Sequence, residues 1–345
     1  MSQQTPPIRT RRPAPTTKTK MTTGGKIGMT LLAILVVTAV AVAATVGWFV
    51  TRVSTSYEGN KETLTEAFPE EETRPAERDD NAQTILLLGS DRRGEIDQDS
   101  LDGPQDSRSD TMMVMHLPAD RDAVFFTSIM RDSWVDIPGF GEAKINAAMA
   151  YGGLPLTVQV VEGLIGTRID QVVVIDFEGF KDLTNALGGV TVTNTVAFEA
   201  QGFNFPAGDI RLNGEEALAF VRARKAFVDG DYQRVRNQQA YMKAVVKQMI
   251  SSETLTNPTR LIALVDAISP YLAVTEGVTT EYIVQTAASL RNVRTSDLYF
   301  VTAPTTGVGW SADGQSIIVL DQDGMAELRE AFETDTLAEY YAAHN

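Results

Sequence analysis

Residues 172–192 read VVVIDFEGFKDLTNALGGVTV, a stretch in which apolar and amphipathic segments alternate. The run 172–176 is short and apolar up to its last residue, which is typical of a strand buried on both faces. Residues 177–187 follow with helical spacing, and Gly188-Gly189 begins a turn into another strand. Buried strands that alternate with amphipathic helices pack in layers. The stretch therefore predicts an α/β fold, a layered α/β/α sandwich around a mixed central sheet.

The alternation continues on both sides of this stretch. Residues 84–88 form another short apolar run, and the runs 112–117 and 123–129 flank a polar turn, which indicates a β-hairpin. Further elements are expected where the same patterns recur. The expected helices are 145–151, 156–165, 212–221, 232–250, 258–268, 280–290 and 325–332, and the expected strands are 298–302 and 317–320.

Residues 222–239, RARKAFVDGDYQRVRNQQ, gather four arginines in a chain that is otherwise acidic. If the chain runs extended through residues 222–224, the side chains of Arg222 and Arg224 point to one side, because side chains repeat every second residue in a strand. Two guanidinium groups on one side form a fork that suits the oxygens of a phosphate. The segment therefore predicts a phosphate site.

The helix expected after this fork begins with another cation. Asp231 is expected to cap the helix, and Arg234 lies in its first turn, where free backbone N–H groups also attract anions. An arginine at this end of a helix favours an anionic ligand. A solvated helix face with ordinary salt bridges to Asp229 and Asp231 is the alternative that the local sequence leaves open.

The first fifty residues indicate a membrane anchor. Residues 1–26 contain six basic and no acidic residues among many prolines and threonines, which is typical of a disordered tail. Residues 27–50 carry no charge and are long enough to cross a bilayer as a helix, with a cleaved signal peptide as the competing interpretation. The basic residues precede this span and the first acidic residue, Glu58, follows it. The positive-inside rule then predicts a single-pass cell-membrane protein with a cytoplasmic N-terminus and an extracytoplasmic remainder.

The composition excludes several classes of function. All 45 acidic residues and 23 of the 30 basic ones lie beyond Arg52, which gives that part of the chain a net charge of −22 and disfavours nucleic acid as a partner. The chain has no cysteine and only two histidines, so metal–thiolate chemistry and a multi-histidine zinc site are excluded.

Prolines and charge mark the expected domain boundaries. Residues 51–80 are polar, acidic and interrupted by two prolines, which is typical of a linker. The folded extracytoplasmic domain is then expected over residues 81–335, with a short C-terminal tail at 336–345. A folded part of this length can bury a sizeable core without disulfides.

Charged residues recur beside the ends of the expected strands. Asp91 follows the strand 84–88, Asp110 precedes the strand 112–117, and Arg131 follows the strand 123–129. Ligands in open α/β sheets bind at such ends. Two carboxylates there offer the oxygen ligands that magnesium prefers when it serves a phosphate. Turn residues, helix caps or a structural ion pair are the simpler interpretation of each residue taken singly.

Taken together and in this order, the segments resemble the LytR-CpsA-Psr family of cell-envelope enzymes over about residues 83–332. The matching stretches are ILLLGSD (85–91), RSDTMMV (108–114), SIMRDSWVDIPGFGEAKINAAMAYGG (128–153), VVVIDFEGFKDLTNALGGVTV (172–192), and LNGEEALAFVRAR with DGDYQRVRNQQ (212–239). One departure is Asn237, because an arginine commonly precedes the paired glutamines in such proteins. Here Arg236 stands one position earlier, which turns a cation by about 100° around the helix.

The resemblance implies a membrane-anchored, magnesium-dependent phosphotransferase. Such an enzyme moves a phosphoglycosyl polymer from a polyprenyl-pyrophosphate carrier to a peptidoglycan hydroxyl and releases polyprenyl phosphate. The resemblance implies that Asp91 and Asp110 hold Mg²⁺, and that Asp110 or Asp231 orients the acceptor hydroxyl. The implied pyrophosphate ligands are Arg108, Arg131, Lys144, Arg222, Arg224, Arg234 and Gln238, and the implied catalytic residues are Asp110, Arg131, Arg222, Arg224 and Asp231.

Two other functions stay open at this point. A pyrophosphatase acting on the same lipid would differ only in using water as the attacking group. A non-catalytic envelope scaffold or regulator that binds polyprenyl phosphate would need the arginines but not the pair of aspartates. The lipid itself needs an apolar tunnel. Candidates for its lining, unless they form simple core, are Met112, Val114, Val124, Phe126 and Val173.

Overall fold

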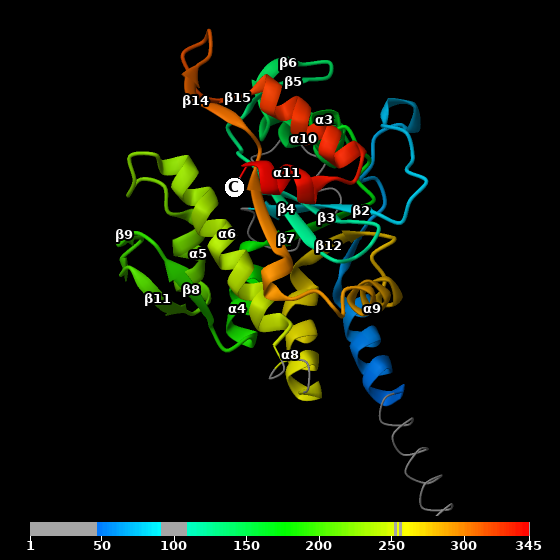
Figure 1. The fold of residues 1–345 in the computed structure, drawn as a ribbon. Helices are drawn as coiled ribbons and strands as arrows, with labels where there is room; N and C mark the ends of the chain where they lie inside the picture. Colours follow the sequence, from blue (N-terminus) through cyan, green and yellow to red (C-terminus); the bar gives the residue numbers. More distant parts are fainter. Residues whose placement is uncertain (1–46, 91–108, 252–253, 255–256, 345) are drawn as a thin grey trace, which may run out of the picture. The chain divides into compact units, whose positions relative to one another are not determined.

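The structure is a computed structural model that divides into two compact units, residues 1–51 and residues 52–345. It describes residues 47–90, 109–251, 254 and 257–344. The described residues do not include the expected N-terminal tail (1–26), most of the expected membrane span (27–50), Asp91 or Arg108. Every strand described belongs to the second unit (Figure 1).

A mixed seven-stranded sheet forms the centre of the second unit, in the order β1-β12-β7-β2-β3-β4-β13. The pairs β2–β3 and β3–β4 are antiparallel, whereas β7 runs parallel to β2 and β13 runs parallel to β4. This arrangement confirms the expected mixed central sheet. Its strands are β1 (Glu62–Leu64), β2 (Gln83–Ser90), β3 (Ser109–Leu117), β4 (Val124–Ile129), β7 (Gln171–Asp176), β12 (Leu272–Thr275) and β13 (Leu298–Thr302).

Helices cover both faces of this sheet (Figure 1). One face is covered by α3 (Ala147–Ile165), α10 (Gln322–Glu333) and α11 (Leu337–His344). The other face is covered by α6 (Gly230–Met249), α8 (Pro258–Ile268) and α9 (Thr280–Ser289).

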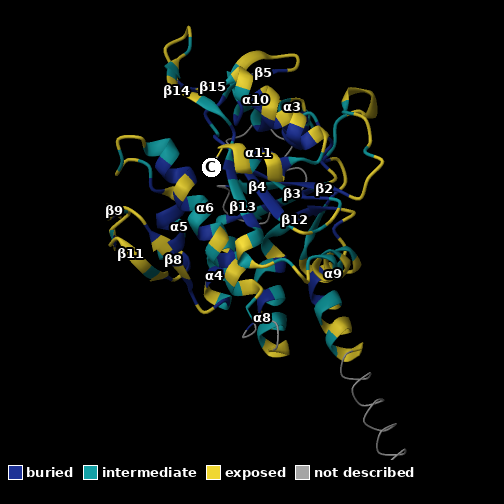
Figure 2. Ribbon diagram, viewed as in Figure 1, coloured by how far each residue is buried: buried dark blue, intermediate teal, exposed yellow. Residues whose placement is uncertain are grey.

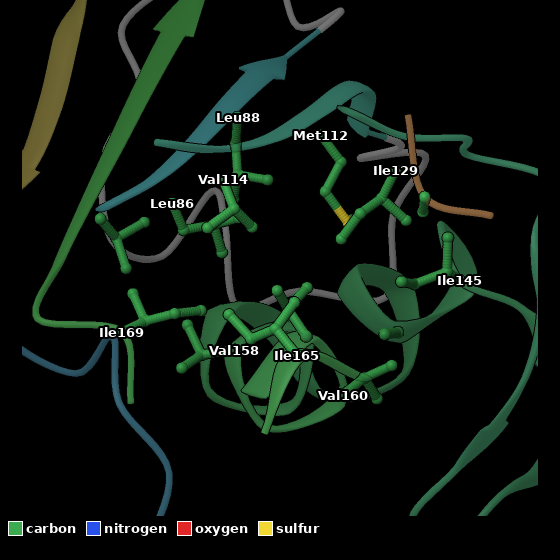
Figure 3. Close-up of a cluster of buried hydrophobic side chains, with 14 of the residues drawn as sticks. Leu86, Leu88, Met112, Val114, Ile129, Ile145, Val158, Val160, Ile165 and Ile169 are labelled. Atoms are coloured by element: carbon green, nitrogen blue, oxygen red, sulfur yellow. The ribbon is translucent and has the colours of Figure 1, made fainter. Parts of the chain in front are cut away.

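The alternation of side chains along β2 and β3 creates the two cores. Leu86 and Val114 point toward α3 and pack with Val158 and Ile165 (Figure 3). Their neighbours in the strands, such as Met113, point to the opposite face and join the side chains of α6 and α9. Figure 2 shows the central strands as the most continuously buried part of the unit.

Helix α3 begins as a short helical segment and bends at Gly152-Gly153, as expected from two helices separated at these glycines. Gly153 has a φ of 64°, which interrupts the regular helix. Among the described residues, α3 is one helix long and apolar enough to cross a membrane, but 56% of its most apolar stretch is buried inside the unit. It is a core helix of the sandwich.

A second core lies beside the sheet, among α4 (Phe177–Ala186), α5 (Gly214–Arg222) and α6. Strand β8 (Val190–Asn194), which follows α4, pairs with β11 (Gly208–Leu212) in a separate ribbon instead of joining the central sheet. The remaining ribbons pair β9 (Phe198–Ala200) with β10 (Phe203–Phe205), β5 (Trp134–Ile137) with β6 (Gly141–Lys144), and β14 (Thr305–Trp310) with β15 (Ser316–Leu320).

The prediction of a linker at residues 51–80 is wrong, because this segment belongs to the folded unit. Tyr57, in a helix that reaches residue 60, is buried and donates its hydroxyl to the Val278 carbonyl over 2.9 Å. Strand β1 then pairs in parallel with β12 at the edge of the sheet, and Leu64 is 2% exposed. The partners of this segment lie some 200 residues away in the sequence, so its acidic composition conceals its place in the sheet.

The prediction of a C-terminal tail at residues 336–345 is also wrong, because most of this segment forms α11. Leu337 and Tyr340 are buried against the core beneath α10. The turn before α11 is fixed by the buried His116, whose Nε2 lies 2.8 Å from Asp335 Oδ1. Leu337 and Tyr340 lie one helical turn apart, and a pattern of only two apolar residues does not distinguish a helix packed on the core from an unstructured tail.

We expect the substitution Leu64→Ala to destabilise the protein by about 2–5 kcal/mol, because it opens a cavity in the first strand of the sheet. Thermal or denaturant unfolding of the variant measures this cost. Glu66→Ala is the matched control, because Glu66 lies two residues further along and is exposed. Equal stability of the two variants would mean that residues 62–64 behave as a linker after all.

Candidate active site

A pocket of about 810 Å³ opens where β2, β3 and β7 approach α4, α5 and the start of α6. One side is apolar and includes Ile175, Phe180 and Leu218. The polar and charged residues of the lining are Thr111, Arg131, Asp176, Glu199, Gln201, Arg222, Arg224, Lys225, Arg234 and Gln238. Five of them are cations and two are carboxyls, so this pocket is a positive site within an acidic unit.

Five of the seven implied pyrophosphate ligands therefore line one pocket: Arg131, Arg222, Arg224, Arg234 and Gln238. Arg108 and Asp91 lie outside the described residues, and so does the side chain of Asp110. The backbone of Asp110 lies at the start of β3, beside the end of β2. Gly89 pairs with Thr111, next to Asp110, and Ser90 precedes Asp91.

The fork of arginines is built differently from the extended run that the sequence suggested. Arg222 is the last residue of α5, and the chain becomes extended only at Ala223. The guanidinium of Arg222 lies over the ring of Phe177, with its central carbon 4.3 Å from the ring centroid. This cation–π contact holds the side chain beside the start of α4. Arg224 lines the same pocket after the extended residue.

Asp231 holds two of the arginines together and does not cap α6. The helix begins at Gly230 and Asp229 is its N-cap residue, so Asp231 lies in the first turn. Its Oδ2 lies 2.9 Å from Arg224 Nη2, and its Oδ1 lies 2.8 Å from Arg234 Nη2. The carboxylate thus joins an arginine of the loop to an arginine of the helix.

Asp132 is a second carboxylate that organises the cations, and it is 4% exposed. Lys144 Nζ lies 3.4 Å from its Oδ1, while Arg131 Nε and Arg224 Nη2 lie 3.6 and 3.5 Å from its Oδ2. Lys144 does not belong to the lining of the pocket. Its place in the structure is therefore beside the carboxylate that orients Arg224, behind the pocket wall.

The pair Asn237-Gln238 fixes α6 in two directions. Gln238 donates from Nε2 to the Thr111 hydroxyl over 3.0 Å, which ties the pocket side of the helix to β3. Asn237 is buried and donates to the Phe220 carbonyl of α5 over 3.1 Å. Arg236 bonds Asp229 and does not line the pocket. Asn237 therefore supports the helix from a buried position that faces α5.

Sequence reasoning missed Asp176 as a residue of this pocket. It is 1% exposed, its Oδ1 accepts the Gly179 N–H at the start of α4, and its Oδ2 has no hydrogen-bond partner within the described part of the chain. Burial raises the pKa of this carboxyl above the ordinary value for aspartate. The sequence did contain a signal for this residue, because Asp176 is an acidic residue at the junction between a buried strand and a helix.

The apolar rows considered for a lipid tunnel belong to packed cores. Met112 and Val114 face α3, and Val124 and Phe126 lie in the core on the other face of the sheet. None of the four lines the pocket. Apolar contact with a ligand is instead available from the aromatic and aliphatic wall formed by α4 and α5.

We expect the stability of Asp176→Asn, relative to wild type, to depend on pH. Because the pKa of Asp176 is raised on folding, the stability given by its protonated form is present at low pH and is lost as pH rises through the raised pKa. The amide stays neutral and can still cap α4. The variant should therefore gain stability over wild type at neutral pH, and this gain should shrink as pH falls toward the ordinary aspartate pKa.

Unfolding measured across this pH range tests the expectation. Asp321→Asn, which changes the capping aspartate of α10 outside the pocket, controls for the general effect of replacing a capping carboxylate. A difference between Asp176→Asn and wild type that does not change with pH would contradict the raised pKa.

Comparison with known proteins agrees with this fold and this arrangement of motifs. A profile of the LytR_cpsA_psr family matches residues 48–334. The cell wall biosynthesis protein LcpA of Corynebacterium glutamicum is 32% identical over 281 residues, which cover 70% of this chain and 54% of LcpA. A Bacillus mycoides protein named polyisoprenyl-teichoic acid–peptidoglycan teichoic acid transferase TagU is 39% identical over 175 residues, which cover 50% of this chain and 55% of TagU.

The chain thus spans about half the length of the curated relatives it matches. Among solved structures, the crystal structure of B. subtilis TagV superposes with a TM-score of 0.62 at 24% identity and covers 75% of this chain and 98% of TagV. That likeness shows the same α/β fold. The family profile covers most of the sequence, including all the motifs that form the pocket. The chain belongs to the LytR-CpsA-Psr family.

Proposed function

We propose that this protein is a phosphotransferase that moves a phosphoglycosyl polymer from a polyprenyl-pyrophosphate carrier to a peptidoglycan hydroxyl and releases polyprenyl phosphate. The name of the relative TagU describes a transfer of this class, and the relative LcpA is named for cell wall biosynthesis. We also propose that residues 27–50 anchor the enzyme in the cell membrane, with the N-terminus in the cytoplasm and the folded unit outside.

The convergence of Arg131, Arg222, Arg224 and Arg234 on one pocket that also has an apolar wall carries this proposal. Guanidinium groups bind phosphate oxygens through paired N–H donors, and a pyrophosphate offers oxygens to several of them at once. The apolar wall can receive the first part of a hydrocarbon chain attached to the phosphate. The pocket thus matches both chemical halves of a polyprenyl pyrophosphate.

In the proposed reaction, the acceptor hydroxyl oxygen attacks the phosphorus that carries the glycan. A new O–P bond forms, the bond from that phosphorus to the bridging oxygen breaks, and the electron pair leaves with polyprenyl phosphate. Negative charge therefore grows on the leaving phosphate, where the arginines stabilise it. Because Arg224 and Arg234 are already held by Asp132 and Asp231, these two side chains need little reorganisation as the charge develops.

The carboxylates take different parts in this mechanism. Both oxygens of Asp231 contact arginines, so Asp231 is a positioning residue for Arg224 and Arg234. Asp110 is the candidate that orients the acceptor hydroxyl and takes its proton, since it lies at the pocket end of β3 beside Thr111.

Magnesium is the proposed cofactor. Asp91 and Asp110 would hold it, because both supply carboxylate oxygens. Asp91 directly follows β2 in the sequence, and Asp110 lies at the start of β3, which pairs with β2. In the part of the chain that the structure describes, no cluster of three or more acidic, histidine or cysteine residues forms a metal site. The bound ion would neutralise charge on the pyrophosphate.

We expect Arg224→Ala to lower the rate of glycan transfer by roughly a hundredfold or more, because it removes a preorganised donor to the developing charge. The measurement uses the full-length protein with a short-chain polyprenyl-pyrophosphate glycan, Mg²⁺ and a peptidoglycan oligomer, and it follows the products by mass. Arg236→Ala is the matched control, since Arg236 lies on α6 but outside the pocket.

The products of the wild-type reaction separate this function from its alternatives. A glycan joined to the oligomer through a phosphodiester supports transfer. Release of free glycan phosphate alone would make the protein a pyrophosphatase, and tight binding of the lipid without any product would make it a scaffold.

We expect Asp110→Ala and removal of Mg²⁺ by EDTA to abolish turnover while lipid binding persists, because the arginines remain in place. Turnover of the carrier lipid and its equilibrium binding to the same samples are the two measurements needed. Unchanged turnover in EDTA would remove magnesium from the mechanism, and loss of binding together with turnover in Asp110→Ala would mean that the aspartate holds the pocket together.

A further inference from the structure

The ribbon formed by β14 and β15 exposes two apolar side chains, Val308 and Trp310, that the mechanism does not use. Trp310 is 74% exposed and Val308 is 63% exposed, and both lie on the same face of β14 because they are two residues apart. Figure 2 shows that the outer end of this ribbon is exposed. Together the two side chains give one face of the ribbon an apolar surface that a ligand can contact.

The base of this ribbon is joined directly to the residues that hold the arginines. Ile318 of β15 donates its N–H to the Asp132 carbonyl over 2.9 Å, and it forms a parallel bridge with Ser133. On the other strand, the hydroxyls of Thr305 and Tyr232 lie 2.7 Å apart, and Tyr232 adjoins Asp231. The ribbon is therefore anchored on the two carboxylate segments that orient Arg224.

The exposed face of the ribbon begins at the helix that borders the pocket. Val308 is directly opposite Ile318, and residues opposite each other in an antiparallel pair project from the same face. Ile318 is buried at 1% exposure with Met130 and with Val235 of α6. The same face then continues outward through Val308 to Trp310. Trp310 is five residues from Thr305, or roughly 17 Å along the strand.

The tip of the ribbon adds polar groups beside this apolar face. Ser311 and Gln315 both bond the carboxylate of Asp313, the latter over 2.7 Å from Nε2 to Oδ2. These hydrogen bonds hold the pKa of Asp313 below its ordinary value, so a fixed negative acceptor stands three residues from the indole. No lysine or arginine occurs between residues 305 and 320.

This combination fits a saccharide better than a membrane surface. The indole face can stack on the C–H face of a sugar ring, while hydroxyl, amide and carboxylate groups beside it bond sugar hydroxyls. An anionic bilayer surface attracts lysine and arginine, which this ribbon lacks, and it repels Asp313.

We propose that the β14–β15 ribbon is a saccharide-binding platform, on which Trp310 stacks against the glycan chain of the acceptor several sugar units away from the reacting hydroxyl. The inference rests on the proposed transfer reaction, because that reaction supplies a polymeric glycan acceptor. The platform is a subsite that raises the affinity for long acceptors and does not contact the reacting end of the acceptor.

The test compares acceptors of graded length, from a single disaccharide unit to long glycan strands, using the full-length protein in detergent. We expect Trp310→Ala to raise the KM for long strands roughly threefold to tenfold, as the loss of one aromatic contact predicts, with kcat and the KM for the disaccharide unchanged. Trp310→Phe should restore most of the affinity. Phe140→Ala, at another exposed aromatic residue on a different ribbon, is the matched control and should leave every KM unchanged.

Binding of the long strands can also be measured directly, by co-sedimentation. This assay tests the platform without relying on the proposed reaction. If the wild type transfers nothing but binds strands through Trp310, the reaction is wrong and the platform stands. The same effect of Trp310→Ala at every acceptor length, or no effect at any length, would overturn the platform. If Trp310→Ala lost binding to vesicles containing anionic lipid but kept its binding to glycan strands, the platform would be overturned in favour of a membrane contact.

Discussion

The candidate site depends on two carboxylates, Asp132 and Asp231, that hold Arg131, Arg224 and Arg234 close together against their mutual repulsion. Arg224 Nη2 contacts Asp231 at 2.9 Å and lies 3.5 Å from Asp132, so one guanidinium group is held between two carboxylates. Asp132 is almost fully buried, which strengthens its interaction with the surrounding cations by lowering the local dielectric. Removing either carboxylate would leave uncompensated positive charge at the pocket.

The first turns of α6 must be fixed in space for this network to face a ligand. Three successive amide side chains do this, because residues about 100° apart on a helix reach different neighbours. Asn237 bonds α5, Gln238 bonds β3, and Gln239 donates to the Ser128 and Thr302 hydroxyls of β4 and β13. The helix is thus tied to the central sheet and to the second core at the same level as the arginines. The asparagine that replaces a common arginine is one of these ties.

The same network connects the pocket to the surface of the unit. Lys144 supports Asp132 from the β5–β6 ribbon, and the β14–β15 ribbon bonds the backbone of Asp132 and the side chain of Tyr232. Two ribbons remote from the arginines in sequence therefore meet behind them.

The sequence by itself determined the elements whose cause is local. Apolar runs bounded by turns indicated the buried strands, helical spacing indicated the helices, and the spacing of charged residues singled out Arg222, Arg224 and Arg234. Only the tertiary structure decided where distant segments pair. It placed β1 in the sheet, folded α11 onto the core, directed Asp176 into the pocket and gave Asp231 two arginine partners instead of a cap. Periodicity records which face of a segment is apolar, but the partner of that face, or of a buried charge, is set by contacts between residues far apart in the chain.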